Sequence, residues 1–200
     1  GAGHRAFCAG ADIKEMARRE EQPETQPSVT PANASARLAS SGKPTIAAIN
    51  GVAIGGGALL ASVVDIRIGC ERSLFRFPGA AFGRINSTWT LPLIVGMPKA
   101  KELLFSARDV EAEEAVSMGL LNRLVPSDRL MDETLELARA IASHPADMIQ
   151  AAKGLVHDYI GMRLPEMPRL EQEVREKLGT LPAKEVFKDF LGTRGTEPRG

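Results

Sequence analysis

Two glycine-rich segments contain the residue types needed to bind a carbonyl oxygen through the backbone. The first reads Phe-Cys-Ala-Gly-Ala-Asp-Ile-Lys over residues 7–14, and the second reads Asn-Gly-Val-Ala-Ile-Gly-Gly-Gly over residues 50–57. Each segment is expected to join a strand to a helix, whose first turn leaves backbone N–H groups without intrahelical partners. Two such N–H groups facing each other would form an oxyanion hole, which stabilises negative charge developing on a carbonyl oxygen. Either segment taken alone is more simply a tight turn with close backbone packing.

The first half of the chain has the pattern of a parallel α/β sheet. An apolar, β-branched run over 44–50 predicts a buried strand, and 51–57 predicts a glycine-punctuated turn. A short helix over 58–63 should follow, and then strands over 65–69 and 74–77. The order of strand, turn, helix and strand is typical of a crossover between parallel strands.

The second half is predicted to be mainly helical. Pro98 suits the first turn of a helix, and Gly119 suits the left-handed residue that follows a helix over 111–118. Ser127 is expected to cap the next helix at its N-terminus. A short strand over 122–125, a helix that starts at Pro145 and helices over 166–178 and 182–191 complete the prediction.

Composition excludes several classes of protein. The 200 residues are 44% hydrophobic and 25% charged, and 25 basic residues balance 25 acidic ones. This balance, without a long Lys/Arg run, argues against nucleic-acid binding. No apolar run reaches the ~20 residues that a membrane span needs. Cys8 and Cys70 are too far apart for a CxxC site and are expected to be reduced thiols of a cytoplasmic protein.

Common catalytic motifs are also missing from the sequence. The glycines at 51–57 do not match the GxGxxG fingerprint of dinucleotide-binding proteins, and neither a phosphate-binding GxxxxGK[ST] loop nor a GxSxG nucleophile elbow occurs. The three histidines lack metal-ligand spacing and are expected to be surface or capping residues; they are His4, His144 and His157.

The two glycine-rich segments together resemble signatures of the crotonase, or enoyl-CoA hydratase/isomerase, superfamily. Residues 3–16 resemble its first signature, and residues 43–57 with the Asp-Ile-Arg of 65–67 resemble its second. Further similarity extends over residues 100–126 and over the C-terminal segment 185–194. The resemblance therefore covers nearly the whole chain.

This resemblance implies a crotonase-like ββα spiral with a helical C-terminal oligomerisation region. Residues 1–140 would form the α/β core with the thioester site, and residues 141–200 the helical trimerisation region of the same domain. The protein is expected to be a cytoplasmic homotrimer or dimer of trimers without a nucleic-acid or membrane partner. Family members usually have a further β-rich segment before the position of Gly1, so N-terminal strands are expected to be missing from this sequence.

The resemblance also implies a site for an acyl-CoA thioester. The backbone N–H groups of Ala11 and Gly56 correspond to the family's oxyanion hole. Coenzyme A, as part of the substrate, would bind along Ala11, Asp12, Ile13 and Lys14 and at Gly56. The Lys14 ammonium is a compact charge suited to phosphate, although an ordinary exposed lysine explains it equally well. No metal and no separate cofactor is expected.

The sequence departs from the family at both catalytic acid positions. Family hydratases have one glutamate three residues after the oxyanion glycine, where this chain has Leu59, and a second after the proline of a Phe-x-x-Pro-Glu motif, where it has Gly79. Hydration needs one group to deprotonate water and one to protonate carbon, and neither residue can do so. No Asp or Glu occurs between Glu24 and Asp65 or between Glu71 and Glu102. Ordinary hydratase activity is therefore expected to be weak or absent.

Three functions stay open on the sequence alone. The first is a hydratase/isomerase-like enzyme, a lyase or isomerase of fatty acid metabolism, with non-standard chemistry. The second is a malonyl-type acyl-CoA decarboxylase relative, for which a missing glutamate removes repulsion of the substrate carboxylate. The third is a non-catalytic CoA-binding homologue. Near the second acid position, Arg84 is expected at the surface, and Trp89 is expected to fill the core rather than to narrow the acyl pocket.

Overall fold

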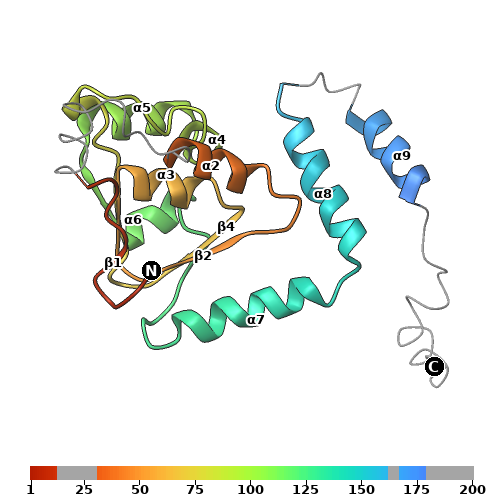
Figure 1. The fold of residues 1–200 in the computed structure, drawn as a ribbon, viewed down its shortest axis with the longest axis horizontal. Coiled ribbons are helices and arrows are strands. Elements are labelled where there is room, and N and C mark those ends of the chain that lie inside the picture. The colour runs from red at the N-terminus through yellow and green to blue at the C-terminus, as the bar shows by residue number, and fades with distance from the viewer. Residues whose placement is uncertain (13–30, 162–166, 179–200) are drawn as a thin grey trace, which may run out of the picture. The chain divides into compact units, whose positions relative to one another are not determined.

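The computed structural model describes residues 1–12, 31–161 and 167–178 of the chain (Figure 1). The chain divides into two compact units, Gly1–His144 and Pro145–Gly200. Two predicted CoA contacts, Ile13 and Lys14, and the predicted helix over 182–191 lie outside the described residues. The other predicted site residues all lie in the first unit.

A four-stranded sheet places the candidate site at one of its edges. Its strands are β1 (Ala6–Cys8), β3 (Val52–Ile54), β5 (Leu74–Arg76) and β6 (Asp109–Glu111), in the order β1-β3-β5-β6. The first three are parallel, and β6 runs antiparallel to β5. The carboxyl ends of β1, β3 and β5 therefore meet at the same edge of the sheet, where ligands of parallel α/β sheets commonly bind.

A second, three-stranded parallel sheet contains β2 (Ile46–Ile49), β4 (Ile66–Gly69) and β7 (Arg123–Leu124), in the order β2-β4-β7. The predicted turn over 51–57 was wrong in part, because Val52–Ile54 forms β3 in the other sheet. The chain changes sheets at Gly51, where an added Cβ would lie 2.3 Å from the Arg5 carbonyl oxygen. Pairing with β1 on one side and β5 on the other outweighs the turn preference of the glycines.

The helices of the first unit cover the strands from two sides. In Figure 1, α2, α3, α4 and α5 lie on one side of the strands and α7 on the other, where α7 packs against β2 and β4. Their bounds are α2 (Pro31–Ala39), α3 (Gly56–Ser62), α4 (Leu91–Val95), α5 (Met97–Ser106), α6 (Ala112–Ser117) and α7 (Leu130–Ala142), with a 3-10 turn, η2 (Ala80–Phe82).

Of the three residues Pro98, Gly119 and Ser127, each predicted to mark a helix end, two lie where predicted. Pro98 is the second residue of α5, as predicted. Gly119 adopts φ 80°, as predicted, and directly follows Met118, the C-cap residue of α6. The predicted Ser127 cap was wrong. Arg129 occupies the N-cap position of α7, and the Ser127 backbone N–H instead donates to Glu71 Oε2 at 3.0 Å. Because α7 begins at Leu130, Ser127 precedes the N-cap position by two residues.

The second unit contains two described helices, α8 (Ala146–Asp158) and α9 (Met167–Leu178), which contact each other. Both were predicted, with the starts displaced by one residue. Among the described residues of the whole chain, no helix is both long and apolar enough to span a membrane.

The core of the first unit lies between its sheets and helices. Arg67 is buried within it, donating from Nε to the Leu120 carbonyl at 2.7 Å and from Nη1 to the Val64 carbonyl at 2.7 Å. Burial lowers the pKa of Arg67 from its ordinary value, and the nearby Asp65 opposes this shift. The largest fully buried side chains include Ile49, Phe75, Phe77, Leu91, Leu103 and Leu120.

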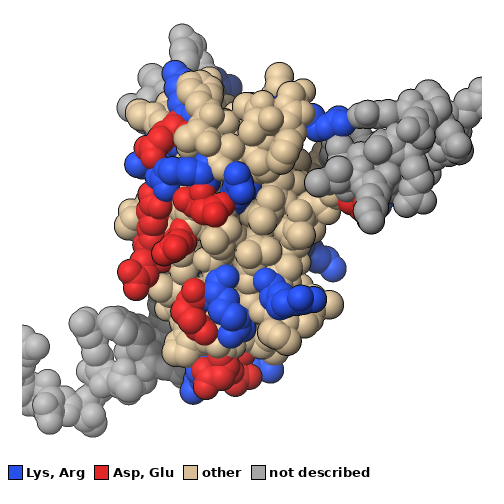
Figure 2. All heavy atoms as spheres, turned by 90° about the vertical axis from the view of Figure 1, so that its left-hand side faces the viewer, with Lys and Arg blue, Asp and Glu red and all other residues tan. Residues whose placement is uncertain are grey.

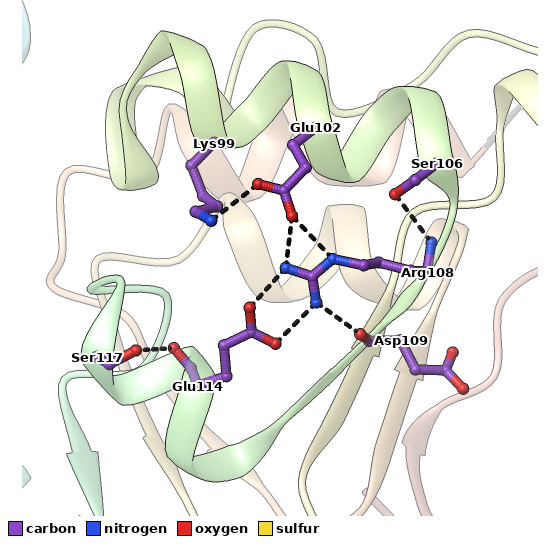
Figure 3. Close-up of polar contacts among 7 residues, drawn as sticks. All are labelled: Lys99, Glu102, Ser106, Arg108, Asp109, Glu114 and Ser117. Carbon is purple, nitrogen blue, oxygen red and sulfur yellow. Dashed lines mark hydrogen bonds and ion pairs between the residues drawn. The ribbon is translucent and has the colours of Figure 1, made fainter.

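Figure 2 shows both basic and acidic side chains on one face of the molecule. An ion-pair network links α5 to α6 through Arg108, which lies between these helices in the sequence (Figure 3). The Arg108 guanidinium binds Glu102 of α5 at 2.7 Å and Glu114 of α6 at 2.8 Å, and Lys99 binds Glu102 at 2.8 Å. The network fixes the two helices around β6.

The Glu114→Gln variant should lower the melting temperature at pH 7 by about 1–4 °C, because the pair is one-third or more exposed and solvent screens it. Hydrogen bonds from Arg108 lower the pKa of Glu114. A carboxyl with a lowered pKa stabilises the fold above its unfolded pKa, about 4.3, and this stabilisation disappears as the pH falls through the folded pKa. The difference between parent and variant should therefore vanish in strong acid.

Thermal melts from pH 7 down to pH 2 measure this effect. Glu113→Gln is the matched control, since Glu113 is an exposed neighbour on the same helix and should change the melting temperature little. A difference between parent and Glu114→Gln that is the same at pH 7 and pH 2 would contradict the assigned role.

Candidate functional site

The structure brings the two glycine-rich segments together at the carboxyl ends of β1 and β3. An added Cβ on Gly10, which has φ 94°, would lie 2.7 Å from the Ile54 carbonyl oxygen and 3.3 Å from the Gly56 nitrogen. An added Cβ on Gly56 would lie 3.8 Å from the Ala11 nitrogen. The predicted pair, Ala11 and Gly56, are therefore neighbours although 45 residues separate them in the sequence. Asp12 follows Ala11 at the exposed end of the described segment.

Three N–H groups in the first turn of α3 have no acceptor within the helix. Gly55 occupies the N-cap position with φ 57°, and its N–H donates to the Arg76 carbonyl at 3.0 Å. Its carbonyl accepts the first helical hydrogen bond, from the Leu59 N–H at 3.0 Å. The N–H groups of residues 56–58 precede this bond and have no acceptor within the helix. Because Gly56 is half-buried and Ala11 is exposed, both are accessible from outside the core.

The close approach of α3 to β1 explains the glycine at position 57. A Cβ there would lie 1.8 Å from the Cys8 carbonyl oxygen, a distance that no side chain tolerates. Gly57 therefore allows the helix to begin directly against the end of β1. Without this contact, the two sets of N–H groups would lie further apart.

The structure places both family acid positions beside the same edge. Leu59 lies one turn into α3 and is half-buried. Gly79 is buried just after β5, and the ring of the preceding Pro78 comes within 4.0 Å of a Cβ added at Gly55. The space around Gly79 is not open, since a Cβ there would lie 3.0 Å from the Arg84 carbonyl oxygen and 3.2 Å from Asn86 Oδ1.

In the segment after Gly79, the prediction for Trp89 was wrong. Trp89 was expected to fill the core, but it is 53% exposed. Ser87, Thr90 and Leu91 occupy the buried positions of this segment instead, and so the tryptophan is displaced outward. Arg84 is exposed, as predicted, and so are the three histidines.

The thiols and the acids of the described residues provide no metal site. Cys8 is half-buried and Cys70 is buried, and both are free. In the part of the chain that the structure describes, no three His, Cys, Asp or Glu side chains come close enough together to hold a metal ion.

Comparison with known proteins decides the family. The model of the enoyl-CoA hydratase/isomerase family matches residues 1–196. The chain belongs to this family. Membership places the protein in the crotonase superfamily and confirms the predicted crotonase-like α/β fold.

Relatives of this enoyl-CoA hydratase/isomerase family member cover most of the chain. It is 35% identical to the short-chain-enoyl-CoA hydratase of Clostridium acetobutylicum, with 98% of this chain and 77% of the relative aligned. It is 31% identical to the 2,3-dehydroadipyl-CoA hydratase of Escherichia coli, with 94% and 70% aligned. The crystal structure of an enoyl-CoA hydratase from Bacillus anthracis matches with a TM-score of 0.86 at 33% identity, covering 98% of this chain and 78% of that one.

Proposed function

We propose that this protein binds an acyl-CoA thioester and polarises its carbonyl between the backbone N–H groups of Ala11 and Gly56. The observation that supports this most directly is the convergence of the two segments, with the Ala11 nitrogen 3.8 Å from a Cβ position on Gly56. Two N–H donors directed at one carbonyl oxygen favour any step that develops negative charge on that atom. Coenzyme A enters as part of the substrate.

The reaction that follows polarisation is not ordinary hydration in this proposal. Leu59 and Gly79 stand where the resemblance implies the two acids, and neither can transfer a proton. The protein then acts as a hydratase/isomerase-like lyase or isomerase with non-standard chemistry. A homotrimer or dimer of trimers and a cytoplasmic location belong to the same proposal and rest on the family resemblance.

A malonyl-type decarboxylase relative is the second candidate. Loss of CO₂ from such a thioester gives an enolate, whose oxygen the same N–H pair would stabilise, and the step needs no carboxylate base. The uncharged residues at 59 and 79 favour this candidate, since a glutamate would repel the carboxylate of the substrate. A non-catalytic CoA-binding homologue would retain the binding and lack both reactions.

Two measurements on the full chain test the proposed carbonyl contact. Titration calorimetry should show butyryl-CoA binding at least about fivefold more tightly than free CoA, since two hydrogen bonds to the thioester are added. Difference infrared spectroscopy with a ¹³C-labelled thioester carbonyl should show its stretching frequency lowered on binding. Equal affinities together with an unshifted carbonyl band would refute polarisation at this site.

A further inference from the structure

The carboxamide of Asn50, between β2 and β3, holds the N-terminal segment of the chain where the two sheets meet. Its Nδ2 group donates to the Gly3 carbonyl at 2.7 Å and to the Gly1 carbonyl at 3.2 Å. Asn50 Oδ1 is buried and has no hydrogen-bond partner among the described residues. The side chain therefore acts through its N–H donors, which a carboxylate of the same shape does not have.

The segment that Asn50 holds lies against β1. Gly3 turns the chain with φ 74°, and an added Cβ on Gly1 would lie 2.5 Å from the Phe7 carbonyl oxygen. Residues 1–3 thus return along the strand that they precede. Directly beside them, the Val52 N–H donates to the Arg5 carbonyl at 3.2 Å.

Support from this segment matters because the pairing of β1 with β3 is short and interrupted. Ala6 is level with Val52 and Cys8 with Ala53, so the register shifts at Phe7. A residue left out of the ladder in this way disrupts the pairing of its strand. Among the described strands, β3 is also the only neighbour of β1 within the sheet. Residues 1–3 lie against β1 at Phe7, where the pairing is interrupted.

The position of β1 sets the position of one carbonyl donor. Ala11 follows the end of β1 by three residues, outside any described strand or helix, whereas Gly56 is the first residue of α3. A displacement of β1 relative to β3 would therefore move the Ala11 N–H away from the Gly56 N–H. An oxyanion donor must lie about 3 Å from the oxygen that it stabilises, so a shift of ~1 Å already weakens the contact.

We propose that Asn50 is a positioning residue, which holds β1 against β3 and so keeps the Ala11 N–H beside the Gly56 N–H. The inference rests on the proposed function, because the two N–H groups act together only if they bind one carbonyl oxygen. Asn50 precedes the amino end of β3 and the site lies at its carboxyl end, so Asn50 acts through β1 and not by contact with the substrate.

Asn50→Asp tests this role, since at pH 7 the aspartate offers no donor to the two carbonyls. Hydrogen exchange measured by mass spectrometry should be at least about tenfold faster in residues 6–11 than in the parent, and unchanged in β2 and β4. The infrared shift of a bound ¹³C-labelled thioester carbonyl should fall by about half or more. The preference for butyryl-CoA over free CoA should fall from about fivefold to under about twofold, while the affinity for free CoA stays within about twofold.

Asn122→Asp is the matched control. Asn122 Oδ1 accepts from the Arg67 N–H at 2.8 Å, and a carboxylate accepts the same hydrogen bond. This variant adds the same charge to the chain, but it should leave the exchange of residues 6–11 and the infrared shift as they are in the parent.

Unchanged exchange of residues 6–11 in Asn50→Asp would overturn the inference. Faster exchange with an undiminished infrared shift would do the same, because β1 would then not position the carbonyl donor. Equally faster exchange in β2 and β4 would also overturn it, since the whole first unit would have loosened. If the parent itself shows neither the shift nor the preference, the proposed function fails and the inference fails with it. Should Asn50→Asp not fold, Asn50→Ala removes the same donors without adding a charge.

Discussion

The purified full chain should hydrate crotonyl-CoA at least about 10²-fold more slowly than a family member with both glutamates. General acid and base groups typically contribute ~10²–10⁴-fold each, although such contributions are not additive. Here the two positions are Leu59 and Gly79, and the space beside Gly79 contains a carboxamide rather than a carboxylate. The assay follows the loss of the absorbance of the conjugated enoyl thioester. Turnover of roughly 10 s⁻¹ or more, a usual enzyme rate, would contradict the expectation.

A matched pair of variants separates missing acids from an altered pocket. Leu59→Glu with Gly79→Glu restores both carboxylates, whereas Leu59→Gln with Gly79→Gln adds side chains of the same size without them. The glutamate pair should hydrate crotonyl-CoA faster than the glutamine pair, and the glutamine pair should match the parent. Because a Cβ at position 79 meets the Arg84 carbonyl oxygen at 3.0 Å, the loop must shift slightly in both variants, so this strain cancels in the comparison.

The two glycine-rich segments are neighbours because a rule of sheet geometry connects them. Ala11 and Gly56 each follow a strand, and adjacent parallel strands end at the same edge. The sequence did not predict β3, so the pairing of β1 with β3 was not available to place the two turns together. The family resemblance then identified which two N–H groups to compare.

Failures of prediction arose where long-range contacts decide local structure. Val52–Ile54 lies among glycines and becomes a strand only because β1 and β5 pair with it. Ser127 is a residue type that often caps helices, but α7 begins three residues later, at Leu130. Trp89 has the large apolar side chain typical of a core residue, yet Ser87 and Thr90 occupy the buried positions nearby. Single-residue propensities contain no information about these partners.

The position of Asn86 near Gly79 in the sequence could be noted, but its contact with Gly79 could not be predicted. Its side chain is one of the few polar groups near the altered acid position, and that much is readable from the sequence. Its contact with the Gly79 position depends on a loop closed by the Arg84 to Gly79 hydrogen bond and on the left-handed Ser87. Neither feature has a sequence signature, since serine is not a usual left-handed residue.

Substitutions at Gly57 and Gly56 should have different effects, the first on the stability of the fold and the second on ligand binding. Gly57→Ala places a Cβ 1.8 Å from the Cys8 carbonyl oxygen, so α3 or β1 must move. We expect a loss of roughly 3–5 kcal/mol in the free energy of unfolding, at the upper end for a single substitution. Urea unfolding followed by far-UV circular dichroism measures this loss. An unchanged unfolding midpoint would show that the helix does not start against β1 as described.

Gly56→Ala should leave the stability of the fold nearly unchanged and weaken the binding of butyryl-CoA. Its Cβ makes only ordinary contacts, 3.7 Å from the Gly10 Cα and 3.8 Å from the Ala11 nitrogen, so the free energy of unfolding should stay within about 1 kcal/mol of the parent. The added methyl group nevertheless lies beside the Ala11 N–H, where the thioester oxygen is proposed to bind. Butyryl-CoA affinity should therefore fall to that of free CoA, and the infrared shift of the bound carbonyl should disappear. If Gly56→Ala binds butyryl-CoA as the parent does, the thioester oxygen does not lie between these two N–H groups, because a methyl group beside one donor would have to obstruct it.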